Sequence, residues 1–328
     1  MNLYPLIKLL SNGEFQTGTL LGEQLGISRT AVWKQIKQLQ ALGLEVITKK
    51  NEGYSFAQPI QLLDTRLIKS RLDAAHSSLV LDFLPVVDST NLELTRRLAN
   101  KDLVSKNASA NTLLIAEKQT AGRGRRGRNW SSPYAASLSL SLSFKVEGGA
   151  NVLQGLSLAV GVVTKDVLSL HGIKNVLLKW PNDLYLNDAK LGGILIELSG
   201  DLAGPCNVIV GLGLNVFRTQ QAIDVDQPVA YLSDGANAAI CRASLAADLA
   251  MAIEKLLINY AIEGFMPWQE KWNAAHIWTG RKASIITPNK NLAVTLGGVT
   301  NTGELQVTYE DGSQGVINAG EVSVRTRL

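Results

Sequence analysis

The sequence Gly122-Arg-Gly-Arg-Arg-Gly-Arg-Asn-Trp130 lies between two segments with the composition of β-strands, residues 111–119 and 136–146. It matches the pattern G-x-G-x-x-G, which in a Rossmann fold is followed by a helix that receives a pyrophosphate. Here residues 129–133 follow the pattern, end in Pro133 and lead into the second strand instead. The stretch also lacks the Gly-Lys-Ser/Thr ending of a P-loop. It therefore predicts a loop between two strands and excludes both nucleotide-binding folds.

This loop concentrates positive charge. Residues 117–130 hold five basic residues against one acidic residue, Glu117. The basic residues are Lys118, Arg123, Arg125, Arg126 and Arg128. Guanidinium and backbone N–H groups bind phosphate oxygens through charge-assisted hydrogen bonds. A solvated surface loop is the alternative, but the density of arginines favours a site for a polyphosphate or for charge that develops on phosphorus.

The segments around the loop predict a mixed sheet with helices. In residues 136–146 apolar residues alternate with serines, which is typical of a strand that is buried on one face only. Apolar residues at helical spacing follow over 152–167 and over 243–262. Further strands are predicted over 176–180, 184–186, 191–198 and 208–214, the middle two joined by a turn at Asn187-Asp188. The fold class is therefore α+β.

Polar residues stand at the ends of several predicted strands, where a rigid scaffold can hold them. These segments are Lys179-Trp-Pro-Asn-Asp183, Lys190-Leu-Gly-Gly-Ile194 and Gly211-Leu-Gly-Leu-Asn215. Upstream, Asp88-Ser-Thr-Asn91 opens a helical pattern, and Thr90 with Glu93 fits a capping box. Each segment alone is weak evidence for a functional site, because an ordinary surface lysine, turn residue or helix cap would give the same residues.

The N-terminal segment has a pattern of its own. Residues 19–25 predict a short helix, Gly26 predicts a turn, and Ser28 predicts the N-cap of a second helix, after which 44–56 predicts a hairpin. A helix-turn-helix followed by a basic hairpin indicates a winged helix that binds DNA. The residues expected to face DNA are Arg29, Thr30, Trp33, Lys34, Lys37, Lys49 and Lys50. A basic face that only keeps the domain soluble is the alternative.

Composition limits the class of protein. The chain has 328 residues, 46% hydrophobic and 18% charged, with a net charge of +4, which indicates a globular protein of two or three domains. Two cysteines and three scattered histidines offer neither a disulfide framework nor a metal-ligand motif. The apolar stretch 243–262 is interrupted by Asp248, Glu254 and Lys255, and no signal-peptide cleavage site is present. We therefore expect a cytoplasmic protein with no metal site and no membrane contact.

Taken together, four of these motifs resemble the signatures of the biotin protein ligase family. They are Asp88-Ser-Thr-Asn91, the arginine-rich loop 122–130, Lys179-Trp-Pro-Asn-Asp183 and Lys190-Leu-Gly-Gly-Ile194. With the winged helix, the chain resembles the bacterial bifunctional biotin ligases and biotin operon repressors. The resemblance implies a winged helix-turn-helix domain over 1–60 and a class II synthetase-like catalytic domain over 61–272. It also implies a small SH3-like β-barrel over 273–328.

The resemblance implies a role for each matching residue. Biotin would be bound by Ser89, Thr90, Asn91, Gln119, Arg123, Gly124, Arg125 and Lys190. ATP and the adenylate would be bound by Arg126, Trp130, Lys179, Asn182 and Asn215. The catalytic residues would be Lys190, Arg123 and Asp183. Asp183 fits two roles, because it either accepts a proton from an attacking amine or only orients Lys190.

The implied reaction joins biotin to ATP, which carries Mg²⁺, and then passes the biotinyl group to a lysine of a carrier, the biotin carboxyl carrier protein of acetyl-CoA carboxylase. The implied partners are this carrier, operator DNA and a second copy of the chain when the adenylate is bound. An open sheet edge with the alternating strand 136–146 would offer the dimer surface. The family closes a mobile loop near residues 217–230, which are acidic here through Asp224 and Asp226, and no role is assigned there.

Two other functions fit parts of the sequence. One is a winged-helix regulator that senses a ligand without turnover, and the other is a lipoate-type ligase on a related scaffold. A sensor of a neutral or singly charged ligand has little need of four loop arginines together with Lys179 and Lys190. The arginine-rich motif and the C-terminal strands favour biotin over lipoate.

Overall fold

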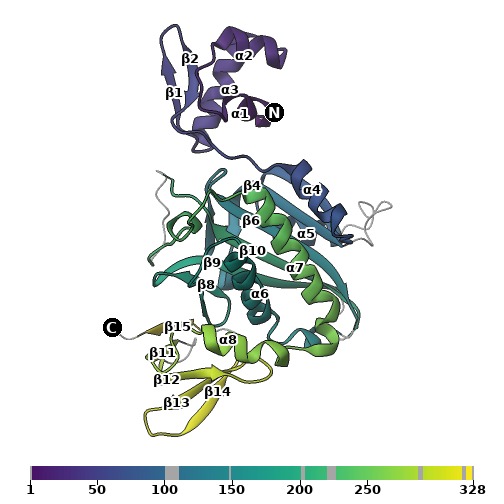
Figure 1. The fold of residues 1–328 in the computed structure, drawn as a ribbon, viewed down its shortest axis with the longest axis vertical. Coiled ribbons are helices and arrows are strands. Elements are labelled where there is room, and N and C mark those ends of the chain that lie inside the picture. Colours follow the sequence, from purple (N-terminus) through teal and green to yellow (C-terminus); the bar gives the residue numbers. More distant parts are fainter. Residues whose placement is uncertain are drawn as a thin grey trace.

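The computed structural model describes residues 2–99, 111–147, 149–200, 204–219, 227–286, 291–319 and 323–326. Within these ranges three sheets follow one another along the chain. Figure 1 shows an N-terminal unit of helices with a hairpin, a large central sheet with helices, and a C-terminal antiparallel sheet. The predicted α+β class is confirmed.

The N-terminal unit is a helix-turn-helix with a wing. Its elements are α1 (Tyr4–Leu10), α2 (Gly18–Leu25), α3 (Arg29–Ala41), β1 (Val46–Lys49) and β2 (Gly53–Phe56). The Ser28 hydroxyl accepts a hydrogen bond from the backbone N–H of Ala31 at 3.2 Å, and Gly26 turns the chain at a φ of 65°. The apolar faces of the helices form a buried core. The predicted N-cap, turn and hairpin are therefore confirmed.

The central sheet is mixed. Its strands are β3 (Val80–Val87), β4 (Thr112–Arg123), β5 (Asn129–Ser132), β6 (Ser137–Val146), β7 (Leu177–Lys179), β8 (Asp183–Leu186), β9 (Ala189–Gly200) and β10 (Cys206–Asn215). Their order is β3-β4-β6-β10-β9-β8-β7, and β5 pairs with β4. Strands β3 and β4 are parallel and the other pairs are antiparallel. Strand β6 lies inside the sheet, so its expected role as an open-edge dimer surface is wrong.

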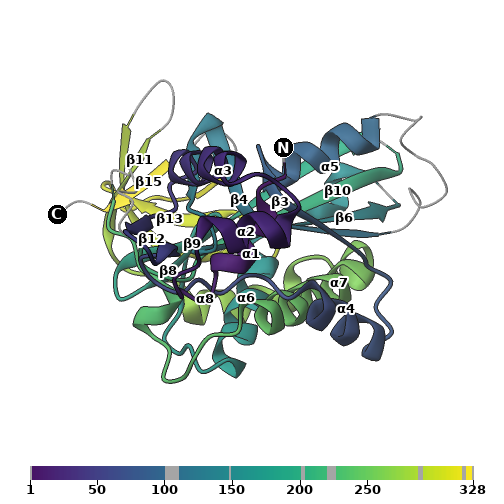
Figure 2. The same cartoon turned by 90° about the horizontal axis from the view of Figure 1, so that it is seen from above.

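Helices cover both faces of this sheet. They are α4 (Thr65–Ala74), α5 (Thr90–Ala99), α6 (Leu156–Leu170), α7 (Arg242–Glu263) and α8 (Gln269–Ala275). Figure 2 shows α5 on one side of the sheet and α6 and α7 on the other. The leucines of β6 belong to the same buried cluster as α6 and α7, while Ser141 of β6 contacts Thr90 of α5. Both faces of β6 are buried, so the predicted half-buried strand is wrong.

Helix α6 and the turn before it form the segment 150–170, which is long and apolar enough to cross a membrane by length and composition. Of its most apolar window, 61% is buried inside the protein. The segment packs against both the sheet and α7, and the core helix of a globular protein meets the same criteria of length and composition. The apolar stretch 243–262 of the sequence lies in helix α7.

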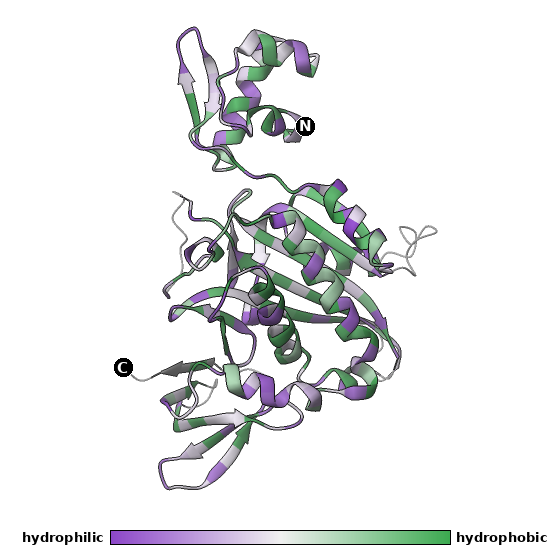
Figure 3. Cartoon of the chain, viewed as in Figure 1, coloured by the Kyte–Doolittle hydropathy of each residue, from purple (hydrophilic) through white to green (hydrophobic). Residues whose placement is uncertain are grey.

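The C-terminal unit is an antiparallel sheet with the order β14-β13-β12-β11-β15. Its strands are β11 (Lys282–Ile286), β12 (Asn291–Val299), β13 (Leu305–Tyr309), β14 (Gln314–Ile317) and β15 (Ser323–Thr326). The indole N–H of Trp180 donates to the carbonyl of Gly303 at 3.0 Å and joins this unit to the central one. Figure 3 shows apolar ribbon concentrated in α6, α7 and the central sheet.

The N-terminal unit also contacts the central unit. The ring of Tyr4 on α1 meets the ring of Phe83 on β3 edge-on, with a centroid distance of 5.3 Å. The Lys118 amine on β4 donates to the carbonyl of Leu42, at the C-terminal end of α3, at 2.8 Å. Tyr134, in the turn before β6, is buried in the N-terminal core. The winged helix therefore rests on the strand that leads into the arginine-rich loop.

Candidate active site

One cavity of about 970 Å³ lies between the central sheet, the arginine-rich loop and the C-terminal unit. Every residue that the sequence analysis assigned to a ligand or to catalysis lines it. They are Ser89, Thr90, Asn91, Gln119, Arg123, Gly124, Arg125, Arg126, Trp130, Lys179, Asn182, Asp183, Lys190 and Asn215. Basic side chains outnumber acidic ones in the lining, so the cavity suits an anionic ligand. The role of each residue stays a prediction.

The start of α5 forms one wall. Ser89, Thr90 and Asn91 are buried, with 2%, 4% and 3% of their surfaces exposed. The backbone N–H and hydroxyl of Thr90 both donate to Oε1 of Gln119, at 2.9 and 3.2 Å. The hydroxyl of Ser89, not of Thr90, accepts from a backbone N–H of the first helical turn. The predicted capping box is therefore wrong, because the Thr90 hydroxyl binds the neighbouring strand instead.

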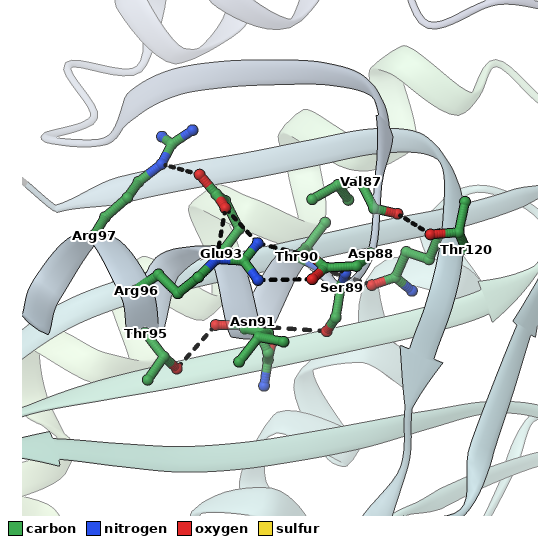
Figure 4. A network of polar contacts seen from close by, with 12 residues as sticks. Val87, Asp88, Ser89, Thr90, Asn91, Glu93, Thr95, Arg96, Arg97 and Thr120 are labelled. Carbon is green, nitrogen blue, oxygen red and sulfur yellow. Dashed lines mark hydrogen bonds and ion pairs between the residues drawn. The ribbon is translucent and has the colours of Figure 1, made fainter.

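A network of ion pairs holds this wall from outside (Figure 4). Arg96 reaches back to Asp88, and its two terminal nitrogens lie 2.6 and 2.9 Å from the two carboxylate oxygens. Arg96 and Arg97 both bind Glu93, which is the residue expected in the capping box. Asp88 also accepts the backbone N–H of Ser89 at 2.7 Å. Hydrogen bonds from Arg96 lower the pKa of Asp88 to about 2, so this carboxylate stays charged.

The arginine-rich loop is a short 3₁₀ turn at Arg125–Gly127, and β5 follows it. The absence of a helix after the glycine pattern is confirmed. The backbone N–H of Gly124 donates to the carbonyl of Arg128 at 2.8 Å, and Arg126 adopts a left-handed φ of 59°. Arg125 donates to the carbonyl of Ala319 in the C-terminal unit. The turn therefore brings its guanidinium groups to the cavity beside the C-terminal sheet.

The hairpin of β8 and β9 brings a lysine and a carboxylate together. The amine of Lys190 lies 2.7 Å from Oδ1 of Asp183, and the two side chains are 17% and 14% exposed. The turn residues Asn187 and Asp188 both have a positive φ, which the predicted two-residue turn requires. The Asn182 side chain donates to the carbonyl of Ile194 at 2.7 Å. The strands thus fix a cation and an acceptor at the cavity wall.

Trp130 and Asn215 lie on the side of the cavity formed by β5 and β10. A side chain at Gly213 would come within 2.6 Å of the Trp130 ring, so this glycine makes room for the indole. The indole N–H of Trp130 is buried and has no partner among the described residues. Asn215 is 6% exposed and donates to the backbone carbonyl of Lys190 at 3.4 Å. An aromatic face therefore lies beside a buried amide.

Comparison with known proteins decides the family. Residues 83–215 match the Biotin/lipoate A/B protein ligase family, and residues 3–55 match the HTH domain family. The bifunctional ligase/repressor BirA of Salmonella typhimurium is 38% identical over 98% of this chain and 97% of its own length. The chain belongs to the bifunctional ligase/repressor family.

Two further proteins support this membership. The bifunctional ligase/repressor BirA of Escherichia coli is 38% identical to this family member over 98% of the chain and 96% of its own length. The biotin protein ligase of Aquifex aeolicus, solved in complex with biotin and ATP, has a TM-score of 0.63 and 26% identity. It covers 75% of this chain and 99% of its own. The central fold of the ligase/repressor is therefore that of a biotin protein ligase.

Several residues at the cavity were missed in the sequence. Trp278 and Arg281 reach it from the C-terminal segment, and no local pattern connects them to the motifs. The Lys179 amine lies 4.5 Å from the centroid of the Trp278 ring and 3.2 Å from the Tyr185 hydroxyl. Glu197 binds Arg123 at 2.7 Å from within β9. A lone carboxylate in an apolar strand is a signal that could have identified Glu197.

Only part of the segment 217–230 lies within the described residues. Asp224 and Asp226 lie outside the described residues, whereas Pro228 and Ala230 bond to the backbone of Lys190. Among the described residues, no three His, Cys, Asp or Glu side chains gather in a group that could hold a metal ion.

The predicted DNA-facing residues form one exposed surface of the ligase/repressor. Arg29, Thr30, Trp33, Lys34 and Lys37 lie on the exposed face of α3, and Trp33 is 50% exposed. Lys49 and Lys50 lie at the tip of the hairpin, also exposed. The amine of Lys49 is 4.3 Å from the centroid of the Phe15 ring. Helix and wing thus present their basic groups to solvent together.

Proposed function

We propose that this chain is an ATP-dependent biotin protein ligase that also represses transcription of biotin synthesis genes. The ligase would form biotinyl-5′-AMP and transfer the biotinyl group to a lysine of the biotin carboxyl carrier protein of acetyl-CoA carboxylase. The observation that carries the proposal is the convergence of all the predicted ligand residues on one cavity of about 970 Å³. A cavity of that size holds a ligand as large as an acyl-adenylate.

Biotin would lie against the start of α5. Ser89, Thr90 and Asn91 would line its pocket with Gln119, which the hydrogen bonds to Thr90 already orient. Arg123, Gly124, Arg125 and Lys190 would surround its carboxylate. This arrangement places the anionic end of biotin beside cations and its ring system among buried polar groups, which fix orientation in such pockets.

ATP would lie beside the arginine-rich loop. Trp130 would stack on adenine and the buried amide of Asn215 would bind its edge, while Arg126, Lys179 and Asn182 would border the phosphates and ribose. Mg²⁺ would arrive on the ATP phosphates and offset their charge. No side chain would need to hold the ion alone.

In the first step, a carboxylate oxygen of biotin would attack the α-phosphorus of ATP. The bond to pyrophosphate would break, and pyrophosphate would take its electron pair. Both reactants are anions, so cations must offset their repulsion as charge builds on phosphorus. Lys190 and Arg123 lie at the cavity wall and fit this role.

In the second step, the amine of the carrier lysine would attack the acyl carbon, and AMP would leave. Asp183 faces the cavity and would accept a proton from that amine. Its 2.7 Å contact with Lys190 equally supports an orienting role. The two roles are compatible, because Asp183 would orient Lys190 during adenylation and accept the proton later, during transfer to the carrier.

The winged helix would bind operator DNA. One recognition helix and one wing contact few phosphates, so a single copy should bind weakly and a homodimer formed with the adenylate should bind well. Lys118 contacts the end of α3, and the next residue, Gln119, lines the cavity, so one strand touches both units. Operator DNA and the carrier would both be met in the cytoplasm, away from membranes.

Transfer of biotin to a carrier domain, followed by mass spectrometry, tests the proposed ligase activity. Purified chain, ATP, Mg²⁺, biotin and a biotin carboxyl carrier domain should give a carrier whose mass rises by one biotinyl group, on a single lysine. The acceptor with that lysine changed to arginine is the matched control. A carrier that stays unmodified while biotin and ATP both bind would favour the ligand-sensing regulator, and modification by lipoate would favour the lipoate-type ligase.

A further inference from the structure

Glu197 bridges two residues that line the cavity on different elements. Its Oε2 accepts a hydrogen bond from the side-chain amide of Asn91 on α5 at 2.8 Å. Its Oε1 accepts from the guanidinium of Arg123, at the end of β4, at 2.7 Å. The Glu197 side chain is 24% exposed and is not among the residues that line the cavity. One side chain of β9 thus holds both α5 and the arginine-rich loop.

A chain of polar contacts continues from Asn91 to Gln119 on β4. The Ser141 hydroxyl lies 2.6 Å from Oδ1 of Asn91 and 2.7 Å from the hydroxyl of Thr90. Thr90 in turn contacts Gln119. The path therefore runs from Arg123, proposed to meet the biotin carboxylate and the reacting phosphorus, to Gln119, proposed to line the biotin pocket.

Asn91 has little freedom in this path. It is 3% exposed, its amide nitrogen also donates to the carbonyl of Leu195 at 3.2 Å, and a side chain at Gly211 would come within 2.2 Å of its oxygen. Arg123 differs, because its side chain is 43% exposed. An arginine whose side chain is nearly half exposed is held by few packing contacts, so it regains rotamer freedom and loses its orientation when its carboxylate partner is removed.

We propose that Glu197 is a positioning residue that sets Arg123 and Asn91 in one arrangement and so couples the arginine-rich loop to the start of α5. The inference rests on the proposed function. A carboxylate suits this position because both of its oxygens accept, and both partners only donate toward it. Glutamine has one acceptor and one donor group, so it keeps one partner and turns an N–H group toward the other.

The test is the Glu197→Gln variant in biotin-dependent exchange of pyrophosphate into ATP. Loss of one charge-assisted hydrogen bond should lower kcat and raise the KM for biotin, so that kcat/KM falls about tenfold or more. Glu147→Gln is the matched control, because Glu147 lies just after β6, is 71% exposed and, among the described residues, forms an ion pair with Lys145. A residue that only stabilises the fold would lower the melting temperature and leave kcat and KM of the folded protein unchanged.

A second measurement does not depend on the reaction. A crystal structure of Glu197→Gln should show Arg123 displaced from its position and the Asn91 amide turned, with the backbone of β9 unchanged. Wild-type kinetics together with wild-type positions of Arg123 and Asn91 would overturn the inference. If the wild-type chain itself shows no biotin-dependent exchange, the proposed function fails, and the side-chain positions in the variant still decide whether Glu197 positions its partners.

Discussion

Lys190 is the residue whose loss should affect chemistry most directly. Its amine contacts Asp183 at 2.7 Å and lines the cavity where charge would develop on phosphorus. We expect Lys190→Ala to lower the rate of adenylation by about a hundredfold or more, as for other groups that stabilise developing charge. The far-UV spectrum should be unchanged. Lys145→Ala, which removes a 64% exposed lysine remote from the cavity, should keep the full rate in the same pyrophosphate exchange assay.

Asp88 gives a pH prediction at the same scale. Hydrogen bonds from Arg96 lower the pKa of Asp88 from its ordinary value of 3.8 to about 2. Because the folded-state pKa is depressed, the stabilisation by this pair is fully present above about pH 4 and is lost as the pH falls toward 2. Arg96→Gln should return the pKa toward 3.8, as followed by carboxyl ¹³C NMR. Arg71→Gln, whose partner is Asp248, should leave Asp88 unchanged, and an unchanged pKa in Arg96→Gln would contradict the assignment.

At the scale of elements, the sequence predicted β6 but not its surroundings. Alternation of leucine and serine predicts a strand with one buried face and one face open to water. In the folded chain the Ser132 hydroxyl lies 2.7 Å from that of Ser137 and 3.1 Å from that of Ser139, so the serines are buried and satisfy one another. Such partners come from other elements, and local periodicity carries no information about them.

In the candidate site, too, local motifs were predictable from the sequence and contacts between distant segments were not. Motif residues such as Lys190 and Trp130 could be predicted, because each lies in a short contiguous motif that resembles a signature of a known family. Trp278 and Arg281 could not, because only folding brings the C-terminal segment to the cavity. Thr90 was expected as a capping residue, and its hydroxyl instead binds Gln119, a contact between residues far apart in the chain.

A buried ion pair joins three elements and gives a stability prediction. Arg242 at the start of α7 pairs with Glu117 on β4 at 2.6 Å, and both side chains are 0% exposed. Glu117 also accepts the backbone N–H of Leu63, in the segment before α4, at 2.6 Å. Arg242→Met should lower the free energy of unfolding by about 3–5 kcal/mol, because it leaves a buried carboxylate without its cation.

Urea denaturation measures this change. Lys69→Met is the control, since the pair of Lys69 with Asp73 is 67% and 63% exposed and should contribute less than about 1 kcal/mol. Equal losses in the two variants would show that the buried pair has no special role in holding α7 to β4.

At the scale of the whole molecule, ligand and DNA binding should be coupled. We expect biotin with ATP to raise both the dimer fraction and the affinity for operator DNA, because two winged helices contact more phosphates than one. The ligand-free chain should stay mostly monomeric. By reciprocity, DNA should favour the adenylate-bound dimer by the same factor. The dimer surface is not β6, which lies inside the sheet.

Sedimentation velocity with and without both ligands, beside a DNA titration at fixed salt, measures this coupling. Arg29→Ala, on the exposed face of α3, should weaken DNA binding and leave ligand-driven dimerisation intact. Ligands that change neither association nor DNA affinity would leave a ligase whose winged helix is not a biotin-regulated repressor. The domain boundaries at 60 and 272 stay predictions, and limited proteolysis with mass spectrometry would locate them.

One cavity is proposed to bind biotin and ATP together and to activate biotin as an adenylate. Exchange of labelled pyrophosphate into ATP measures that step without a carrier or DNA, because only reversible formation of an acyl-adenylate returns the label to ATP. We predict exchange that requires biotin, that is absent with lipoate at the same concentration, and that Lys190→Ala reduces. Exchange that does not depend on biotin, or that lipoate supports equally well, would contradict the proposed activation of biotin in this cavity.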